Sequence, residues 1–108
     1  MEITKRLLEV ITENTGIDVT LRTRKRETVE MRSLYCNVLK DLQPNKTLKS
    51  IGDSLNLDHS TIVHSLNKYQ MYERFSPELK SMRKIIISNF KEEEEEIKET
   101  KKTYAIIE

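Results

Sequence analysis

The segment Asp58 to Ser65 (DHSTIVHS) concentrates hydrogen-bonding side chains: one carboxylate, three hydroxyls and two imidazoles. These groups donate and accept hydrogen bonds, but they do not form a set of nucleophile, base and orienting group. His59 and His64 are five residues apart, so they do not share a helix face, and no Cys or carboxylate joins them to complete a metal site. We therefore expect recognition rather than catalysis, with no enzyme activity, no cofactor and no metal.

Positive charge gathers upstream of this segment. The formal net charge of the 108 residues is only +1, yet residues 22–49 contain eight Lys or Arg against three Asp or Glu. Three of the eight are consecutive: Arg24, Lys25 and Arg26. A local basic stripe is typical of proteins that bind polyanions, although the same residues could be an ordinary solvated surface with Glu27 and Glu30 as helical partners.

Apolar residues at three- and four-residue spacing predict the helices that position these groups. The predicted helices cover residues 2–14, 25–42, 47–55 and 58–74, and a last one begins at Ser76-Pro77-Glu78. Residues 17–23 alternate like a strand but have no second strand to pair with, so we expect an extended connector. Cys36, the single cysteine, is expected in the core. The fold class is therefore all-α, with five helices in one domain over residues 1–90 and a charged tail or helical extension over residues 91–108.

The third and fourth predicted helices are joined by so few residues that they must cross steeply, as in a helix-turn-helix. Leu57 would fill the turn, and Ile62 and Leu66 would face inward. Polar side chains at the start of the fourth helix would then point outward, where they can enter the major groove of DNA, which is about 12 Å wide. The residues expected to contact bases there are Asp58, His59, Ser60, Thr61 and His64. Those expected to contact phosphates are Arg32, Lys46, Lys49 and Lys68. An N-cap role would by itself explain Asp58.

Three motifs in order then resemble a known family. The segments RKRETVEMR (Arg24 to Arg32), LKSIGDSL (Leu48 to Leu55) and DHSTIVHS are similar to the C-terminal DNA-binding domain (domain IV) of the bacterial replication initiator DnaA. The resemblance covers roughly Ile3 to Phe90 and implies a Trp-repressor-like domain with a helix-turn-helix that reads a short box in duplex DNA. It also implies a basic loop that contacts the minor groove or phosphates, with Arg26 as the first candidate for a groove-inserted arginine and Arg24 as the second.

The resemblance implies sequence-specific binding of double-stranded DNA, either by a regulator of replication initiation or by a phage or mobile-element protein. No GxxxxGK[ST] loop accompanies it, so an initiator's nucleotide-binding domain is not expected. Two alternatives remain: a protein-interaction module that contacts replication initiator proteins, and a transcriptional regulator with an unrelated operator. Because the sequence has no long apolar stretch and no signal-peptide pattern, we expect no membrane partner and a cytoplasmic, nucleoid-associated protein. The acidic run 92–96 is expected to be a solvated face or a shield over the basic residues.

Overall fold

The computed structural model describes residues 3–91 of the chain, and all regular secondary structure in this range is helical. The labelled helices are α1 (Ile3–Thr15), α2 (Arg26–Leu42), α3 (Leu48–Leu55) and α4 (His59–Phe75), followed by a C-terminal helix that occupies residues 77–91 of the described range. The predicted all-α class is therefore confirmed, and the four labelled helices begin and end within one residue of the predicted bounds. Nearly all of the predicted tail, including the acidic run 92–96, lies outside the described residues.

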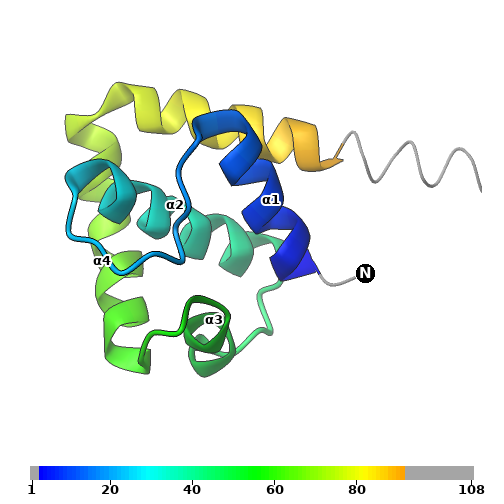
Figure 1. Cartoon of the computed structure of the whole chain (residues 1–108), viewed down its shortest axis with the longest axis vertical. Helices are drawn as coiled ribbons and strands as arrows, with labels where there is room; N and C mark the ends of the chain where they lie inside the picture. The colour runs from blue at the N-terminus through cyan, green and yellow to red at the C-terminus, as the bar shows by residue number, and fades with distance from the viewer. Residues whose placement is uncertain (1–2, 92–108) are drawn as a thin grey trace, which may run out of the picture.

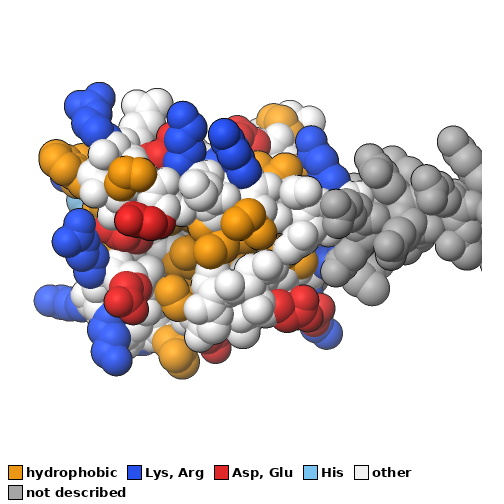
Figure 2. Space-filling view, turned by 90° about the horizontal axis from the view of Figure 1, so that it is seen from above, with side chains coloured by type: hydrophobic (Ala, Val, Ile, Leu, Met, Phe, Trp, Pro, Cys, Tyr) orange, Lys and Arg blue, Asp and Glu red, His pale blue; other side chains and the backbone are white. Residues whose placement is uncertain are grey.

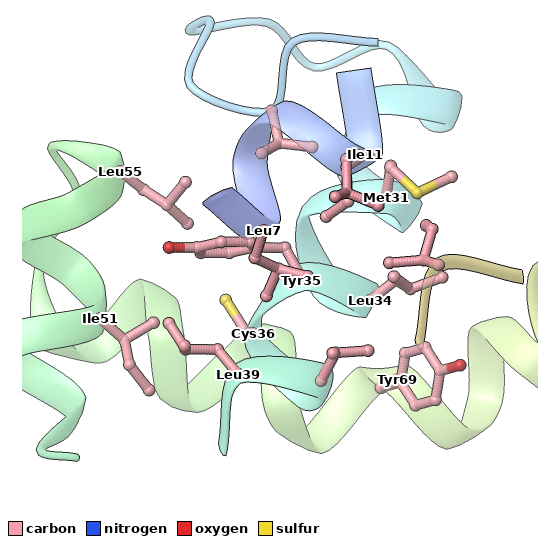
Figure 3. Packing of buried hydrophobic residues seen from close by; sticks show 14 of the residues in the cluster. Leu7, Ile11, Met31, Leu34, Tyr35, Cys36, Leu39, Ile51, Leu55 and Tyr69 are labelled. Carbon is pink, nitrogen blue, oxygen red and sulfur yellow. The ribbon is translucent and has the colours of Figure 1, made fainter. Parts of the chain in front are cut away.

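Helix α2 is the central element, with α1 and α4 packed against it (Figure 1). Residues 33–36 are buried on every side of one helical turn, and Tyr35 and Leu39 are completely buried. A helix with no solvated face over a whole turn must be covered by neighbours all round. Figure 3 shows this arrangement: Leu7 of α1 and Leu55 of α3 approach the Tyr35 ring from different elements.

The connector between α1 and α2, residues 16–25, is irregular, and it is held against α2 by one arginine. Arg32 donates from Nε to the carbonyl oxygen of Val19 at 3.1 Å and from Nη2 to that of Leu21 at 2.6 Å. Val19 itself is buried. The sequence predicts an extended connector, but the structure has a turn here, in which the Leu21 amide donates to the Asp18 carbonyl at 3.3 Å. The Arg32 side chain, reaching back from α2, holds this turn in place.

The C-terminal helix covers α1 and α2 with the face that the sequence predicts. Leu79, Ile86 and Phe90 are buried. Asn89 Nδ2 donates to Asn14 Oδ1 of α1 at 2.9 Å, and Arg83 donates to both Asn37 and Asp41 of α2. The hydrophobic core therefore includes residues from near the start of the described range to its end.

Cys36 lies in this core, as predicted, and burial raises the pKa of its thiol to about 12. A thiol in that environment stays protonated at neutral pH and behaves as a small apolar group. None of the helices in residues 3–91 combines the length and the apolar composition that crossing a membrane requires.

Candidate nucleic-acid interface

The link between α3 and α4 is short and well defined. Thr47 caps the start of α3, where its Oγ1 accepts a hydrogen bond from the Ser50 amide at 3.1 Å. Asn56 ends α3 in the left-handed conformation, with φ 57°, which Asn tolerates better than most residues. The Leu57 amide then donates to the Gly52 carbonyl at 2.8 Å. In Figure 1 α3 is seen nearly end-on, whereas α4 runs up the left side in the plane of the picture, so the two helices cross steeply.

Gly52 makes this crossing possible. A Cβ at this position would lie 2.6 Å from the Leu57 carbonyl oxygen, a distance that real Cβ atoms essentially never show. The backbone of α3 therefore touches the turn directly. Ile51, Leu55 and Ile62 are buried beside it, as the sequence predicts for the shared core of the two helices. α3 consequently fixes where the first turn of α4 lies.

Asp58 caps α4 and is locked to Thr61. Asp58 Oδ1 accepts hydrogen bonds from the Thr61 amide at 2.9 Å and from the Thr61 hydroxyl at 2.6 Å. The hydroxyl contact, then the amide contact, lowers the pKa of the Asp58 carboxyl below its usual value. Because the Thr61 proton is used in this way, the Thr61 oxygen is left to accept hydrogen bonds. The structure therefore confirms the N-cap role considered for Asp58.

The other residues of the predicted tip face solvent. His59, Ser60 and His64 are exposed at the start of α4. Lys68 lies one turn further along the same face as His64 and is partly exposed, and Lys49 of α3 is exposed. These side chains could reach a ligand without any rearrangement of the core.

Arg32 and Lys46, which the sequence predicts to contact phosphates, make contacts within the fold instead. The guanidinium of Arg32 is used within the fold, where it donates to two carbonyl oxygens of the connector, so we assign it a structural role. Lys46 is partly buried, and its carbonyl accepts a hydrogen bond from Lys40 Nζ at 2.8 Å, which helps to order the loop before α3.

The basic residues Arg24, Lys25 and Arg26 are exposed, but they do not lie beside the first turn of α4. Arg24 and Arg26 line a cleft whose other wall comes from the C-terminal half of α4, at Met71, Tyr72 and Phe75. Thr61 and Tyr72 are separated by about 16 Å along the helix axis, at 1.5 Å per residue. The two parts of the predicted site therefore lie near opposite ends of one helix.

The two arginines of this cleft differ in their contacts. Arg26 Nε pairs with Glu30 Oε1 at 3.0 Å, whereas Arg24 makes no ion pair among the described residues. Sequence reasoning ranks Arg26 first for insertion into a groove, and the geometry favours Arg24, because Arg24 can move without breaking an ion pair.

Sequence reasoning missed the apolar side of this cleft. Met71 is 40% exposed and Phe75 is 69% exposed. Both lie off the inward stripe of α4 that Ile62, Leu66 and Tyr69 define. An apolar pair four residues apart outside the inward stripe was the signal that could have identified this surface.

Residues 3–91 contain no group of three or more His, Cys, Asp or Glu side chains that could hold a metal ion. No family model, no curated protein and no solved structure matches the chain. Evidence for function therefore comes from the residues themselves.

Proposed function

We propose that this protein binds double-stranded DNA sequence-specifically, with the first turn of α4 in the major groove. The supporting observation is the exposure of His59, Ser60 and His64 at the leading end of a helix that Gly52 holds tightly against α3. A reading element must be both accessible and rigid, because each base contact requires a fixed position and direction.

The side chains of this turn have complementary roles on base edges. The imidazoles of His59 and His64 donate hydrogen bonds to guanine N7 or O6, and the Ser60 hydroxyl donates or accepts. Thr61 accepts through its oxygen and presents its methyl group to a thymine methyl, while its hydroxyl donates its hydrogen bond to Asp58 Oδ1. A mixed set of donors and acceptors distinguishes base pairs, whereas lysines alone would not.

The proposed phosphate contacts lie near both ends of α4. Lys68 follows the first turn along α4 and Lys49 is exposed on α3. Arg24 lines the cleft at Tyr72, which lies about 16 Å from Thr61 along α4 at 1.5 Å per helical residue. One turn of DNA is about 34–36 Å, so this separation is about half a turn, the spacing from a major groove to the neighbouring minor groove. Arg24 would then reach the minor groove or backbone of the same duplex.

The resemblance to the DNA-reading domain of the initiator DnaA supports a role in replication initiation. The three segments that carry it are the start of α2, α3, and the cap and first turn of α4. We propose that the chain occupies short initiator-type boxes, as a regulator of initiation or as a phage or mobile-element protein that uses them.

Selection from randomised duplexes, followed by fluorescence anisotropy on the selected duplex and on a scrambled one, tests this proposal. His64→Ala or Ser60→Ala should cost about 1–3 kcal/mol on the selected duplex and almost nothing on the scrambled one. Lys49→Ala should weaken both and reduce the salt slope by about one unit. Lys80→Ala, an exposed change on the C-terminal helix, is the control. Equal losses on both duplexes for His64→Ala would contradict base reading.

A further inference from the structure

The cleft between the start of α2 and the C-terminal half of α4 has an apolar side that the proposed duplex contacts do not use. Its volume is about 250 Å³. Arg24, Arg26, Val29 and Glu30 form one side, and Met71, Tyr72 and Phe75 form the other. The cleft therefore brings basic and aromatic side chains together at the surface.

The apolar side of the cleft is unusually exposed. Phe75 has 69% and Met71 40% of its surface accessible, and they lie one helical turn apart on α4. Figure 2 shows apolar side chains at the surface beside Lys and Arg at the end of the molecule away from the grey residues. Exposed apolar side chains that lie together and are rimmed by polar residues are a feature of interaction sites.

The charge around the cleft selects the kind of ligand. The segment that supplies its basic side has four exposed cations in five consecutive positions, Arg22, Arg24, Lys25 and Arg26, of which Arg24 and Arg26 line the cleft. The carboxylate inside the cleft, Glu30, is neutralised by its ion pair with Arg26 at 3.0 Å. The excess charge is therefore positive, and the matching ligand is an anion that also carries a flat apolar face.

We propose that this cleft binds an unpaired nucleotide of single-stranded DNA, with the base stacked on Phe75 and the flanking phosphates held by Arg24 and Lys25. Aromatic rings that stack bases beside cations that hold the backbone are the usual basis of single-strand binding. The nucleotide must be unpaired, because in a duplex neighbouring bases cover both faces of each base. The inference rests on the proposed function, since it places a single-stranded segment next to the duplex that the first turn of α4 contacts.

Anisotropy with a fluorescein-labelled 12-nucleotide oligo(dT), which forms no duplex, measures this binding directly. Phe75→Ala should weaken binding about tenfold, because the base loses the aromatic ring on which it stacks. Phe75→Trp should retain binding, and Phe75→Leu should lose it like Phe75→Ala, because leucine is apolar but has no ring. Ile85→Ala removes an apolar side chain that is 45% exposed outside the cleft, and should leave binding unchanged.

A second measurement reports on stacking itself. An oligonucleotide with one 2-aminopurine should change its fluorescence on binding the wild-type protein and not on binding Phe75→Ala. Equal affinity of wild type and Phe75→Ala for oligo(dT) would overturn the proposal. Self-association that Phe75→Ala abolishes, without binding of oligo(dT), would also overturn it and would assign the face to a second copy of the chain.

The two proposals fail separately. If Phe75→Ala loses oligo(dT) binding but the wild type shows no selectivity among duplexes, single-strand binding in the cleft is supported and base reading by α4 is contradicted. If duplex selectivity depends on His64 but Phe75→Ala leaves the oligo(dT) affinity unchanged, base reading by α4 is supported and single-strand binding in the cleft is contradicted.

Discussion

At the residue scale, Asp58 caps α4, and in our proposal it also lies among the side chains that face DNA. Its Oδ1 accepts hydrogen bonds from the amide and from the hydroxyl of Thr61, at 2.9 and 2.6 Å. The second carboxylate oxygen is therefore the one available to a cytosine amino group. Replacing Asp58 would disturb the helix start and base contact together, so a test of base reading should use His64 or Ser60.

The cap should respond to pH. The pKa of Asp58 is lowered in the folded chain, chiefly by the Thr61 hydroxyl, so the cap contributes stability above the unfolded value of about 3.9 and loses it as the pH falls through the folded pKa. The amide chemical shift of Thr61, followed by NMR during acid titration, should change with a midpoint below about 3.9.

The start of α3 supplies an internal control for this titration. The Ser50 amide is capped by the hydroxyl of Thr47, which does not titrate. Its shift should stay constant over the range in which that of Thr61 moves. In Asp58→Asn the titration of Thr61 should disappear, and a titration that persisted would mean that another carboxylate controls this turn.

At the scale of elements, the contact between α3 and the turn before α4 determines how the proposed reading turn is presented. It depends on the absence of a side chain at Gly52, where the backbone of Leu57 approaches. A Cβ added at Gly52 would first meet the backbone carbonyl oxygen of Leu57. This oxygen cannot move aside as the end of a flexible side chain can. Relief could come only from a shift of the turn or of α3.

Gly52→Ala should therefore destabilise the protein by about 1–3 kcal/mol, the usual cost of overpacking. Urea unfolding followed by circular dichroism measures this loss. Asp53→Ala, at the exposed neighbouring position, should stay within about 0.5 kcal/mol of the wild type. If Gly52→Ala were as stable as Asp53→Ala, the close approach of α3 to the turn would be refuted.

The helices were predictable because each has a local signal. Ile62, Leu66 and Tyr69 repeat with helical spacing, Asp58 marks a start, and Pro77 marks another. The exposure of His59 and His64 followed from the same periodicity. These features depend on residues close together in the sequence, so they can be read without knowledge of the tertiary structure.

Other features depend on contacts between distant residues. Arg32 looks like any surface cation in the sequence, yet its partners are carbonyls 11 and 13 residues away in the connector. The position of Arg24 near Phe75 depends on how α2 packs against α4. The sequence contains no local signal for either contact, which is why it predicts Arg32 at phosphates and does not predict where the basic cluster lies relative to α4.

At the scale of the whole molecule, the C-terminal helix is part of the same core as α1 and α2. Phe90 is buried, and the guanidinium of Arg6 lies 5.2 Å from the centre of its ring. Asn89 and Asn14 are hydrogen-bonded across the same contact. A single core of this kind predicts one cooperative unfolding transition.

Phe90→Ala should lower the free energy of unfolding by about 3–5 kcal/mol, the typical cost of removing a buried Phe side chain. Ile85→Ala, at an exposed position of the same helix, should cost much less. Thermal unfolding followed by circular dichroism and by the fluorescence of the tyrosines should give coincident curves in each variant. Separate transitions would show that the C-terminal helix folds independently of α2.

The hydrogen bond between Asn14 and Asn89 also has a consequence for biosynthesis. Its two partners are 75 residues apart in the chain, which a ribosome adds in roughly 4–15 s at about 5–20 residues per second. Within that interval α1 and α2 are completed before the helix that covers them has been translated. The nascent chain therefore exposes part of its future core for seconds, and this is the stage at which a chaperone would find it.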